Sequence, residues 1–223
     1  MGKDGVMYDA FISYRHSELD SFVAATLHKQ LESFKLPRGV LRNKIREMRQ
    51  PEAGEQQSKE LTKEVKTRIH RVFRDKEELP LATNLADPIR EALQNSEYLI
   101  VICSPRLPES MWCRKEIETF IEMHDREHVL AVLAEGEPAA SFPEELLYRE
   151  AEEKQPDGSI LKVKIPVEPL AADVRGMRRR EIRRKIKSEL LRLVAPMFDC
   201  SYDDLKQRHK EQRTRKILAA AMS

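Results

Sequence analysis

The sequence predicts an α/β fold in which a parallel sheet is covered by helices on both faces. The main observation is a regular alternation of short apolar runs with longer segments whose apolar residues recur every three to four positions. The run from Tyr98 to Ser104 is the most continuous apolar stretch of the chain, as expected for a strand buried on both faces. Because crossovers in a parallel sheet place helices over both faces, this run predicts the centre of the sheet.

Two strand–helix units are predicted in the first half of the chain. The first strand runs from Tyr8 to Ser13, and the segment from Leu19 to Phe34 then has apolar residues at helical spacing on one face. A second, short strand is expected from Arg71 to Phe73, before a helix from Ala82 to Gln94. In that helix Pro88 is compatible only with the first turn.

The second half of the chain is predicted to complete the sheet. Ser110 is a candidate N-cap for a helix from Met111 to about Asp125. A fourth strand is expected from His128 to Leu133, and a fifth near Val163 to Val167. In such a sheet, ligands bind outside the carboxyl ends of the strands. The segments predicted at that edge are residues 13–16, 74–79 and 104–110.

Two charged segments interrupt this pattern. Lys35 to Thr67 is long and strongly charged, and we interpret it as an insertion at the rim of the sheet. Two interpretations are open for it, an insertion with a helix of its own from Ser58 to Arg68 or a disordered loop. Glu152 to Ser159 is predicted to be a surface loop, with turn residues at Asp157 and Gly158.

The composition is that of a globular protein with a heavily solvated surface. Of 223 residues, 40% are apolar and 35% charged, which excludes collagen-like and wholly disordered chains. Because 40 basic residues nearly balance 38 acidic ones, the net charge of +2 argues neither for nor against nucleic-acid binding. The three cysteines form no CxxC pair and have no histidine at metal-ligand spacing. A reduced, cytoplasmic chain without a metal site is expected.

The last fifty residues are predicted to be a basic helical extension, 173–223, after a domain at 1–172 whose insertion covers about 35–68. Gly176 to Met197 has an apolar helical stripe among many Arg and Lys residues, and Asp203 to Lys216 is also basic. One interpretation is a helix docked by its apolar side. The other is the cytoplasmic flank of a membrane tether that begins beyond Ser223, because the cations precede the apolar run ILAAAMS. Nucleic acid is not expected as a partner, since no aromatic residues interleave with these cations.

Four segments, taken together, resemble a bacterial Toll/interleukin-1 receptor (TIR) domain. They are YDAFISYR at 8–15, VFRDKEELP at 72–80, IREALQNSEYLIVICSP at 89–105 and SMWCRKEIE at 110–118. Their order and spacing agree with the family over residues 6–170. The resemblance implies a flavodoxin-like fold with five parallel strands. It also implies one of two functions: cleavage of NAD+ at the nicotinamide–ribose bond, to linear or cyclic products, or non-enzymatic assembly with other TIR domains as a signalling scaffold.

The resemblance implies a catalytic glutamate on the third helix, at Glu116, four residues after Trp112. NAD+ is then the substrate, and no cofactor is implied. One carboxylate suffices, because nicotinamide leaves as a neutral ring and needs no general acid, unlike the alkoxide of an ordinary glycoside. Glu116 can supply negative charge near the developing oxocarbenium carbon and accept hydrogen bonds from ribose hydroxyls. Its position near the start of the helix favours the ionised form.

The same resemblance assigns further residues to the nicotinamide–ribose pocket. They are Phe11 or Ser13, Tyr14 and Arg15 around the end of the first strand, and Arg74 and Asp75 after the second. The family also implies self-association, since an adjacent subunit often completes the site. The loop after the second strand departs from the family pattern. It has Pro80–Leu81 where TIR domains commonly have Pro-Gly, and this puts self-assembly through that loop in doubt.

Structural interpretations of the same residues stay open. Without the resemblance, Glu116 is a solvated residue on a charged helix, because glutamates are rarely buried. By the resemblance Trp112 also faces the ligand, but it is equally compatible with core or helix packing. Arg15 is also compatible with a surface cation at a strand end. The charged segment RDKEELP, 74–80, is either a solvated run or a gating or assembly loop.

Overall fold

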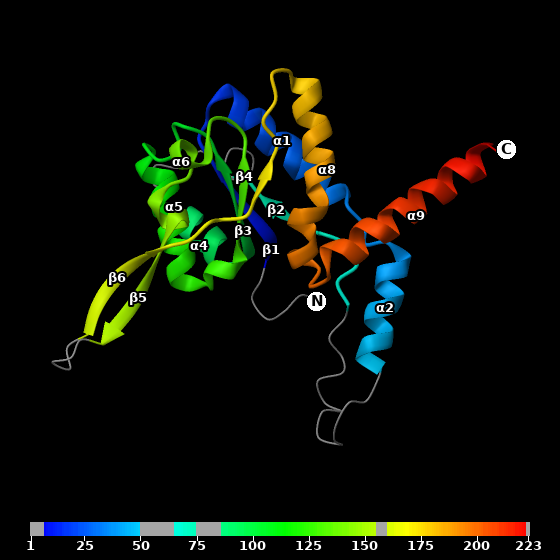
Figure 1. Ribbon diagram of the computed structural model, residues 1–223, viewed down its shortest axis with the longest axis horizontal. Coiled ribbons are helices and arrows are strands. Elements are labelled where there is room, and N and C mark those ends of the chain that lie inside the picture. Colours follow the sequence, from blue (N-terminus) through cyan, green and yellow to red (C-terminus); the bar gives the residue numbers. More distant parts are fainter. Residues whose placement is uncertain (1–6, 50–64, 75–85, 155–159, 222–223) are drawn as a thin grey trace.

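A five-stranded sheet with all strands parallel forms the centre of the computed structural model, which describes residues 7–49, 65–74, 86–154 and 160–221 (Figure 1). The spatial order is β2-β1-β3-β4-β7, which corresponds to the order 2-1-3-4-5 of flavodoxin-like folds. The predicted fold class is confirmed. The strands are β1 (Tyr8–Tyr14), β2 (Val72–Phe73), β3 (Ser96–Cys103), β4 (Val129–Leu133) and β7 (Ala171–Asp173).

The strand β3 is the central strand, as its apolar run predicted. Its register places Leu99 opposite Phe11 of β1 on one side and opposite Val129 of β4 on the other. Every residue from Leu99 to Cys103 is 0% exposed. Because successive side chains point to opposite faces, a strand covered on both faces needs an apolar residue at every position.

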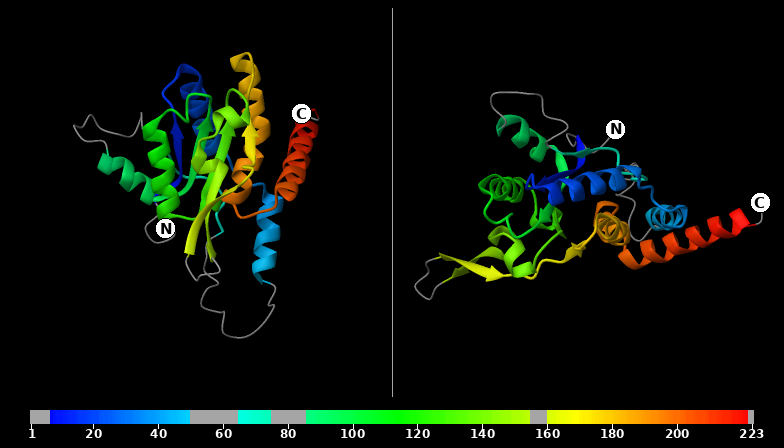
Figure 2. Two further views of the ribbon diagram at one scale, coloured as in Figure 1. Left: turned by 60° about the vertical axis from the view of Figure 1, so that its left-hand side comes forward. Right: turned by 90° about the horizontal axis from the view of Figure 1, so that it is seen from above.

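Two hydrophobic cores lie on the two faces of the sheet. One is formed with the helices α1 (Glu18–Ser33) and α8 (Arg179–Met197), and the other with α4 (Ala86–Gln94) and α5 (Met111–Met123). Figure 2 shows these helices from two further directions. In β1, Ile12 belongs to the α1/α8 core and Phe11 to the α4/α5 core. This alternation decides which side chains at the end of β1 lie beside α5.

The helix ends follow the local chemistry of the sequence. Ser17 caps α1 by accepting a hydrogen bond from the Asp20 N–H at 3.0 Å. Ser110 caps α5, as predicted, by accepting one from the Cys113 N–H at 3.4 Å. The helix α4 begins at Ala86, so Pro88 lies in the first turn, where its missing N–H leaves no hydrogen bond unmade. The part of this predicted helix before residue 86 lies outside the described residues.

The fifth strand of the sheet is not the predicted one. Residues 163–166 belong to β6 (Ile160–Pro166), which pairs antiparallel with β5 (Tyr148–Lys154) in a separate hairpin that projects from the domain in Figure 1. The alternating pattern ILKVKIP correctly indicates a strand but carries no information about its partner. The actual fifth strand, β7, has three residues, too few for periodicity to show.

The hairpin also corrects the predicted surface loop from Glu152 to Ser159. Residues 152–154 are the end of β5, whereas 155–159 lie outside the described residues. Between β4 and the hairpin the chain forms two short helices, α6 (Pro138–Ser141) and α7 (Glu144–Leu147).

The predicted insertion after α1 contains a helix, but at another place. The helix α2 (Arg38–Arg49) follows α1 almost directly. Of the predicted helix from Ser58 to Arg68, residues 65–68 are described and are not helical; the rest lies outside the described residues. Lys35 and Arg68 instead form an antiparallel bridge, and the Leu36 N–H donates to the Thr67 carbonyl at 2.9 Å. These contacts close the base of the insertion.

The helix α8 docks on the sheet through the stripe that the sequence predicted. Its apolar residues Ile182, Ile186 and Leu190 lie in the same core as α1, so the predicted division after residue 172 falls inside β7 and ahead of a core helix. The last helix, α9 (Tyr202–Ala221), buries Leu205 completely. In the part of the chain that the structure describes, no helix is long and apolar enough to cross a membrane. The tether predicted beyond Ser223 stays a prediction.

Candidate functional site

The carboxyl end of β1 lies beside the first turns of α5. Phe11 is 1% exposed and stacks on Phe73 of β2, with ring centroids 4.9 Å apart. Ser13 is also 1% exposed and lies two residues further along the same face of the strand. Phe11 is therefore part of the hydrophobic core beneath Ser13.

Ser13 and Glu116 are in direct contact. The Ser13 hydroxyl donates a hydrogen bond to Glu116 Oε2 at 2.6 Å, a length typical of a charge-assisted O–H···O⁻ bond. On α5, the buried residues Cys113, Ile117 and Phe120 pack toward the sheet. Glu116 lies on the same side of the helix, three residues after Cys113, and is half-buried. The helix thus holds this carboxylate at the boundary between core and solvent.

Tyr14 lies on the opposite face of the sheet from Ser13. It is 3% exposed, belongs to the α1/α8 core, and has its ring tilted against His16 with centroids 4.8 Å apart. Adjacent residues of a strand point to opposite faces, so Tyr14 and Ser13 cannot both face α5.

Arg15 connects the end of β1 to the loop before α5. Its Nη1 donates to the Arg106 carbonyl at 3.2 Å and lies 3.7 Å from the carboxylate of Glu109. Both side chains of this ion pair are exposed, so it contributes little to stability. It does keep a cation at the edge of the sheet where Glu116 lies.

The other predicted site residues have different surroundings. Trp112 is 70% exposed at the start of α5, one turn before Glu116, so it is not a core residue. Arg74 follows β2 and is 6% exposed. Asp75 and the Pro80–Leu81 pair lie outside the described residues.

A second carboxylate at this edge, Asp20 of α1, has no counterpart in the sequence-based predictions. Asp20 is 1% exposed and accepts a hydrogen bond from the Ser104 hydroxyl at 2.9 Å, while its Oδ1 has no hydrogen-bond partner among the described residues. Burial raises the pKa of Asp20 above its usual range, and hydrogen bonds from Ser104 and Ser17 partly offset this. An aspartate in the first turn of a helix is ordinarily explained by the helix dipole, so nothing in the sequence points to its burial.

The arrangement supplies one oriented carboxylate rather than a metal site. Because Ser13 holds Oε2, Glu116 has a preferred orientation, unlike a freely rotating surface glutamate. Among the residues described, no group of three or more His, Cys, Asp or Glu side chains is placed to hold a metal ion. Such a carboxylate can stabilise a developing positive charge or accept hydrogen bonds from a bound hydroxyl.

Two cavities in the described part of the chain lie away from Glu116. One of about 920 Å³ is bordered by α1, α2, α8 and α9, and one of about 410 Å³ lies near Tyr98, His128 and Cys200. Neither is lined by Ser13 or Glu116.

The sequence matches known proteins around the same residues. A family model for the TIR domain matches residues 51–160, which include Glu116 but not β1. NAD(+) hydrolase ApTIR from Actinoplanes sp. is 29% identical over 130 residues, which are 58% of this chain and 14% of that protein. The chain carries a TIR domain. The match spans only a small part of the Actinoplanes protein, so the similarity does not extend to the rest of that protein.

Two solved TIR structures are also similar to this TIR domain. The TIR domains of the activated Roq1 resistosome that recognises the pathogen effector XopQ are 21% identical, with 59% of this chain and 60% of that chain covered and a TM-score of 0.38. The TIR domain of the Toll-related receptor TRR-2 from Hydra magnipapillata is 19% identical, with 57% and 70% covered and a TM-score of 0.36. The fold assignment itself rests on the order and direction of the five strands.

Proposed function

We propose that the TIR domain cleaves NAD+ at the nicotinamide–ribose bond, with Glu116 as the catalytic carboxylate. The observation that carries this proposal is the 2.6 Å hydrogen bond by which Ser13 orients Glu116. It lies at the carboxyl edge of the sheet, where parallel α/β folds bind their ligands. The 29% identity to a protein named as an NAD(+) hydrolase supports the same substrate.

The reaction needs one group that favours positive charge on the ribose. The bond between ribose C1′ and the pyridinium nitrogen breaks, and its electron pair goes to the nitrogen, so nicotinamide leaves neutral. The Glu116 carboxylate stabilises the oxocarbenium ion that forms. Water adds to C1′ and releases a proton, which gives ADP-ribose; attack by an adenine nitrogen in place of water gives a cyclic product. The proposal requires no cofactor.

Self-association is the second part of the proposal. Met111 and Trp112 are 77% and 70% exposed at the start of α5, one turn from Glu116. Large apolar side chains exposed next to each other are characteristic of interaction surfaces. A neighbouring TIR domain seated on this pair adds its own residues beside Glu116, so activity rises as the domains are brought together.

The alternative is a non-enzymatic scaffold that acts through TIR–TIR assembly. The exposed pair Met111 and Trp112 favours this function too, because assembly needs a contact surface but no oriented carboxylate. On a scaffold, Glu116 only stabilises the packing of α5 on β1 through Ser13. The two functions therefore differ in what removal of the Glu116 carboxylate does.

Nicotinamide release from NAD+ by the purified chain, at low and high protein concentration, tests the proposal. The variant Glu116→Gln is compared with Glu118→Gln, an exposed glutamate on the same helix. For the hydrolase, release per domain rises with concentration, is lost in the first variant and persists in the second. If release is absent at every concentration while light scattering shows association, the protein is a scaffold and the proposal is wrong.

A further inference from the structure

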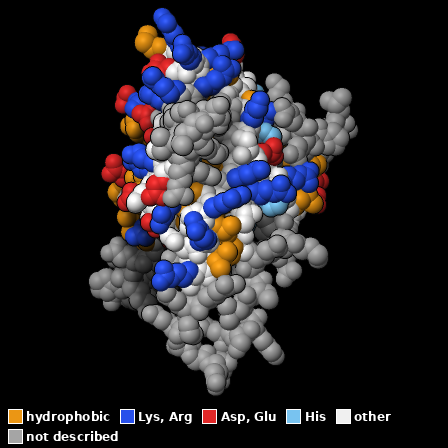
Figure 3. All heavy atoms as spheres, turned by 90° about the vertical axis from the view of Figure 1, so that its right-hand side faces the viewer, with side chains coloured by type: hydrophobic (Ala, Val, Ile, Leu, Met, Phe, Trp, Pro, Cys, Tyr) orange, Lys and Arg blue, Asp and Glu red, His pale blue; other side chains and the backbone are white. Residues whose placement is uncertain are grey.

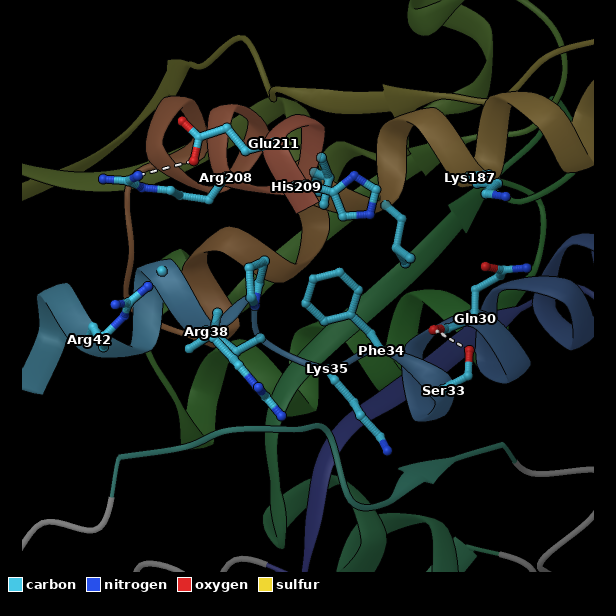
Figure 4. A pocket seen from close by; sticks show the side chains of 15 residues that line it. Gln30, Ser33, Phe34, Lys35, Arg38, Arg42, Lys187, Arg208, His209 and Glu211 are labelled. Atoms are coloured by element: carbon cyan, nitrogen blue, oxygen red, sulfur yellow. Dashed lines mark hydrogen bonds and ion pairs between the residues drawn. The ribbon is translucent and has the colours of Figure 1, made fainter. Parts of the chain in front are cut away.

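The 920 Å³ cavity lies in a part of the molecule that the proposed reaction does not use. Its walls come from the end of α1, the segment 34–37, α2, α8 and α9, so elements from both ends of the chain meet around it (Figure 4). Its volume is within the range of about 300–1,000 Å³ that is usual for small-molecule sites.

Positive charge dominates the lining of this cavity. Six of the side chains that border it carry basic groups, and one, Glu211, is acidic. Glu211 is already paired with Arg208 at 3.1 Å. The basic lining residues are Lys35, Arg38, Arg42, Lys187, Arg208 and His209.

Four of these cations have no acidic partner among the residues that the structure describes. Lys35, Arg38, Arg42 and Lys187 are exposed and form no ion pair with any carboxylate of the described residues. Lys and Arg side chains also predominate on the face of the molecule toward α8 and α9 (Figure 3). Several unpaired cations around one cavity repel each other, and an anion bound among them relieves that repulsion.

One side of the cavity is apolar. Phe34, Leu36 and Leu190 line it and are 8%, 7% and 6% exposed, so they present a closed hydrophobic surface rather than mobile side chains. The Phe34 ring lies in the middle of the lining, between the basic side chains of α2 and α8 (Figure 4). A flat apolar ring can pack on such a surface while its charged substituent reaches the cations.

The walls are held together by specific contacts. Lys44 of α2 donates hydrogen bonds to the carbonyls of Phe198 and Asp199, at 2.5 and 2.6 Å, just after α8. A Cβ atom on Gly39 would lie 2.9 Å from Cδ of Arg208, so glycine at this position lets α2 approach the Arg208 side chain of α9. The cavity is thus fixed by the docking of α2 on the C-terminal helices.

We propose that this cavity binds a nucleoside polyphosphate. The phosphates lie against Arg38, Arg42, Lys35 and Lys187, since guanidinium groups pair with phosphate oxygens in a bidentate manner and lysines act as point charges. The base packs on the Phe34 wall. Since α2 and α9 form part of the site, the ligand fixes the basic C-terminal helices on the TIR domain, independently of the proposed Glu116 chemistry.

Calorimetric titration of the purified chain with ATP, adenosine and inorganic tripolyphosphate tests the site. The double variant Arg38→Gln/Arg42→Gln is compared with Arg90→Gln/Arg149→Gln, which removes the same charge from exposed positions on α4 and β5 outside the cavity. We expect saturable ATP binding that weakens at least about tenfold in the first variant and less than about twofold in the second. Tripolyphosphate binds more weakly than ATP, and adenosine more weakly still.

Three results would overturn this site. The first is no ATP binding, whether or not anionic vesicles or duplex DNA bind. The second is an equal loss of ATP affinity in both double variants. The third is ATP binding that NAD+ displaces and Glu116→Gln abolishes. The substituted side chains are exposed, so unchanged thermal midpoints will show that the variants are folded. Because Glu116→Gln leaves this cavity intact, failure of the hydrolase proposal and failure of this one give different results.

Discussion

The hydroxyl of Ser13 donates a 2.6 Å hydrogen bond to Glu116, a residue 103 positions later in the chain. The bond joins the carboxyl end of the buried strand β1 to the first half of α5. The helix α5 packs against the face of the sheet to which Ser13 points. The orientation of the Glu116 carboxylate therefore depends on how α5 docks on β1, and not on α5 alone.

Ser13→Ala is expected to lower kcat for NAD+ cleavage about tenfold with little change in KM. The variant keeps the carboxylate but loses the donor that orients it, and a charge-assisted hydrogen bond is worth about 1.5–3 kcal/mol. Steady-state kinetics checks this against Ser104→Ala, which removes the hydroxyl bonded to Asp20. A similar fall in both variants would mean that Ser13 acts only through general stability.

Glu116→Gln is expected to lower nicotinamide release at least about 100-fold while the thermal midpoint changes little. The amide has the same shape but no negative charge to stabilise the oxocarbenium ion. Glu118→Gln serves as the control in the same assay. If Glu116→Gln keeps more than about a tenth of the parent activity, Glu116 is not the catalytic carboxylate.

Trp112→Ala is expected to weaken self-association without lowering stability. The side chain is 70% exposed, so its removal leaves no cavity in the core. Sedimentation and turnover are measured over a range of protein concentrations, with Leu170→Ala, another exposed apolar residue, as the control. If both variants associate like the parent chain, the contact surface lies elsewhere.

Asp20→Asn is expected to raise the stability of the protein at neutral and alkaline pH. Burial raises the folded-state pKa of Asp20, because the buried site favours the protonated carboxyl. The stability that protonated Asp20 contributes is therefore complete below the unfolded pKa of 3.8 and is lost as the pH rises through the raised folded-state pKa. The difference between variant and parent should therefore vanish near pH 3. Thermal unfolding at pH 3 and pH 8 checks this, with the exposed Asp203→Asn as control. Destabilisation at pH 8 would show that the ionised form is needed.

Tyr98→Phe is expected to cost about 1 kcal/mol, or a thermal midpoint lower by about 2–4 °C. The Tyr98 hydroxyl donates to the Pro196 carbonyl at 2.9 Å and ties β3 to the end of α8. Burial, and to a smaller extent the charges of Glu97 and Asp199, raises the pKa of Tyr98 to about 12. The stability that the neutral hydroxyl contributes is therefore complete below the unfolded pKa of 10.0 and is lost as the pH rises toward 12. Tyr148→Phe, at a 40% exposed tyrosine, should unfold like the parent chain.

The elements with strong local signals could be predicted from the sequence. The central strand β3 is apolar from Tyr98 to Cys103, and Ser110 has a side chain that accepts a hydrogen bond from an N–H group of its own helix. The strand β7 could not be predicted, because three residues held by pairing with β4 have no pattern of their own. The expectation that Val163 to Val167 belongs to the main sheet is wrong for a related reason: its true partner, the charged strand β5, has no strand pattern of its own and pairs with β6 outside that sheet.

The residues of the candidate site were suggested by the resemblance and not by a sequence pattern, and Glu116 as the catalytic residue stays a prediction. Every position of β1 from Ala10 to Ser13 is buried, so its sequence has no polar face to show that Ser13 points toward α5 and Tyr14 away from it. The roles assigned to Phe11, Tyr14 and Arg74 stay predictions. The buried carboxylate of Asp20 could not be predicted, because its burial depends on Ser104, 84 residues away.

The outer strands of the main sheet are short. The strand β2 pairs with β1 through two residue pairs, and β7 pairs with β4 through three. An incoming strand from another chain would find few backbone groups to pair with at either edge, which is how many native sheets avoid edge-to-edge growth. Oligomers of this TIR domain are therefore expected to form through side-chain surfaces, and to dissolve on dilution rather than grow irreversibly into fibres.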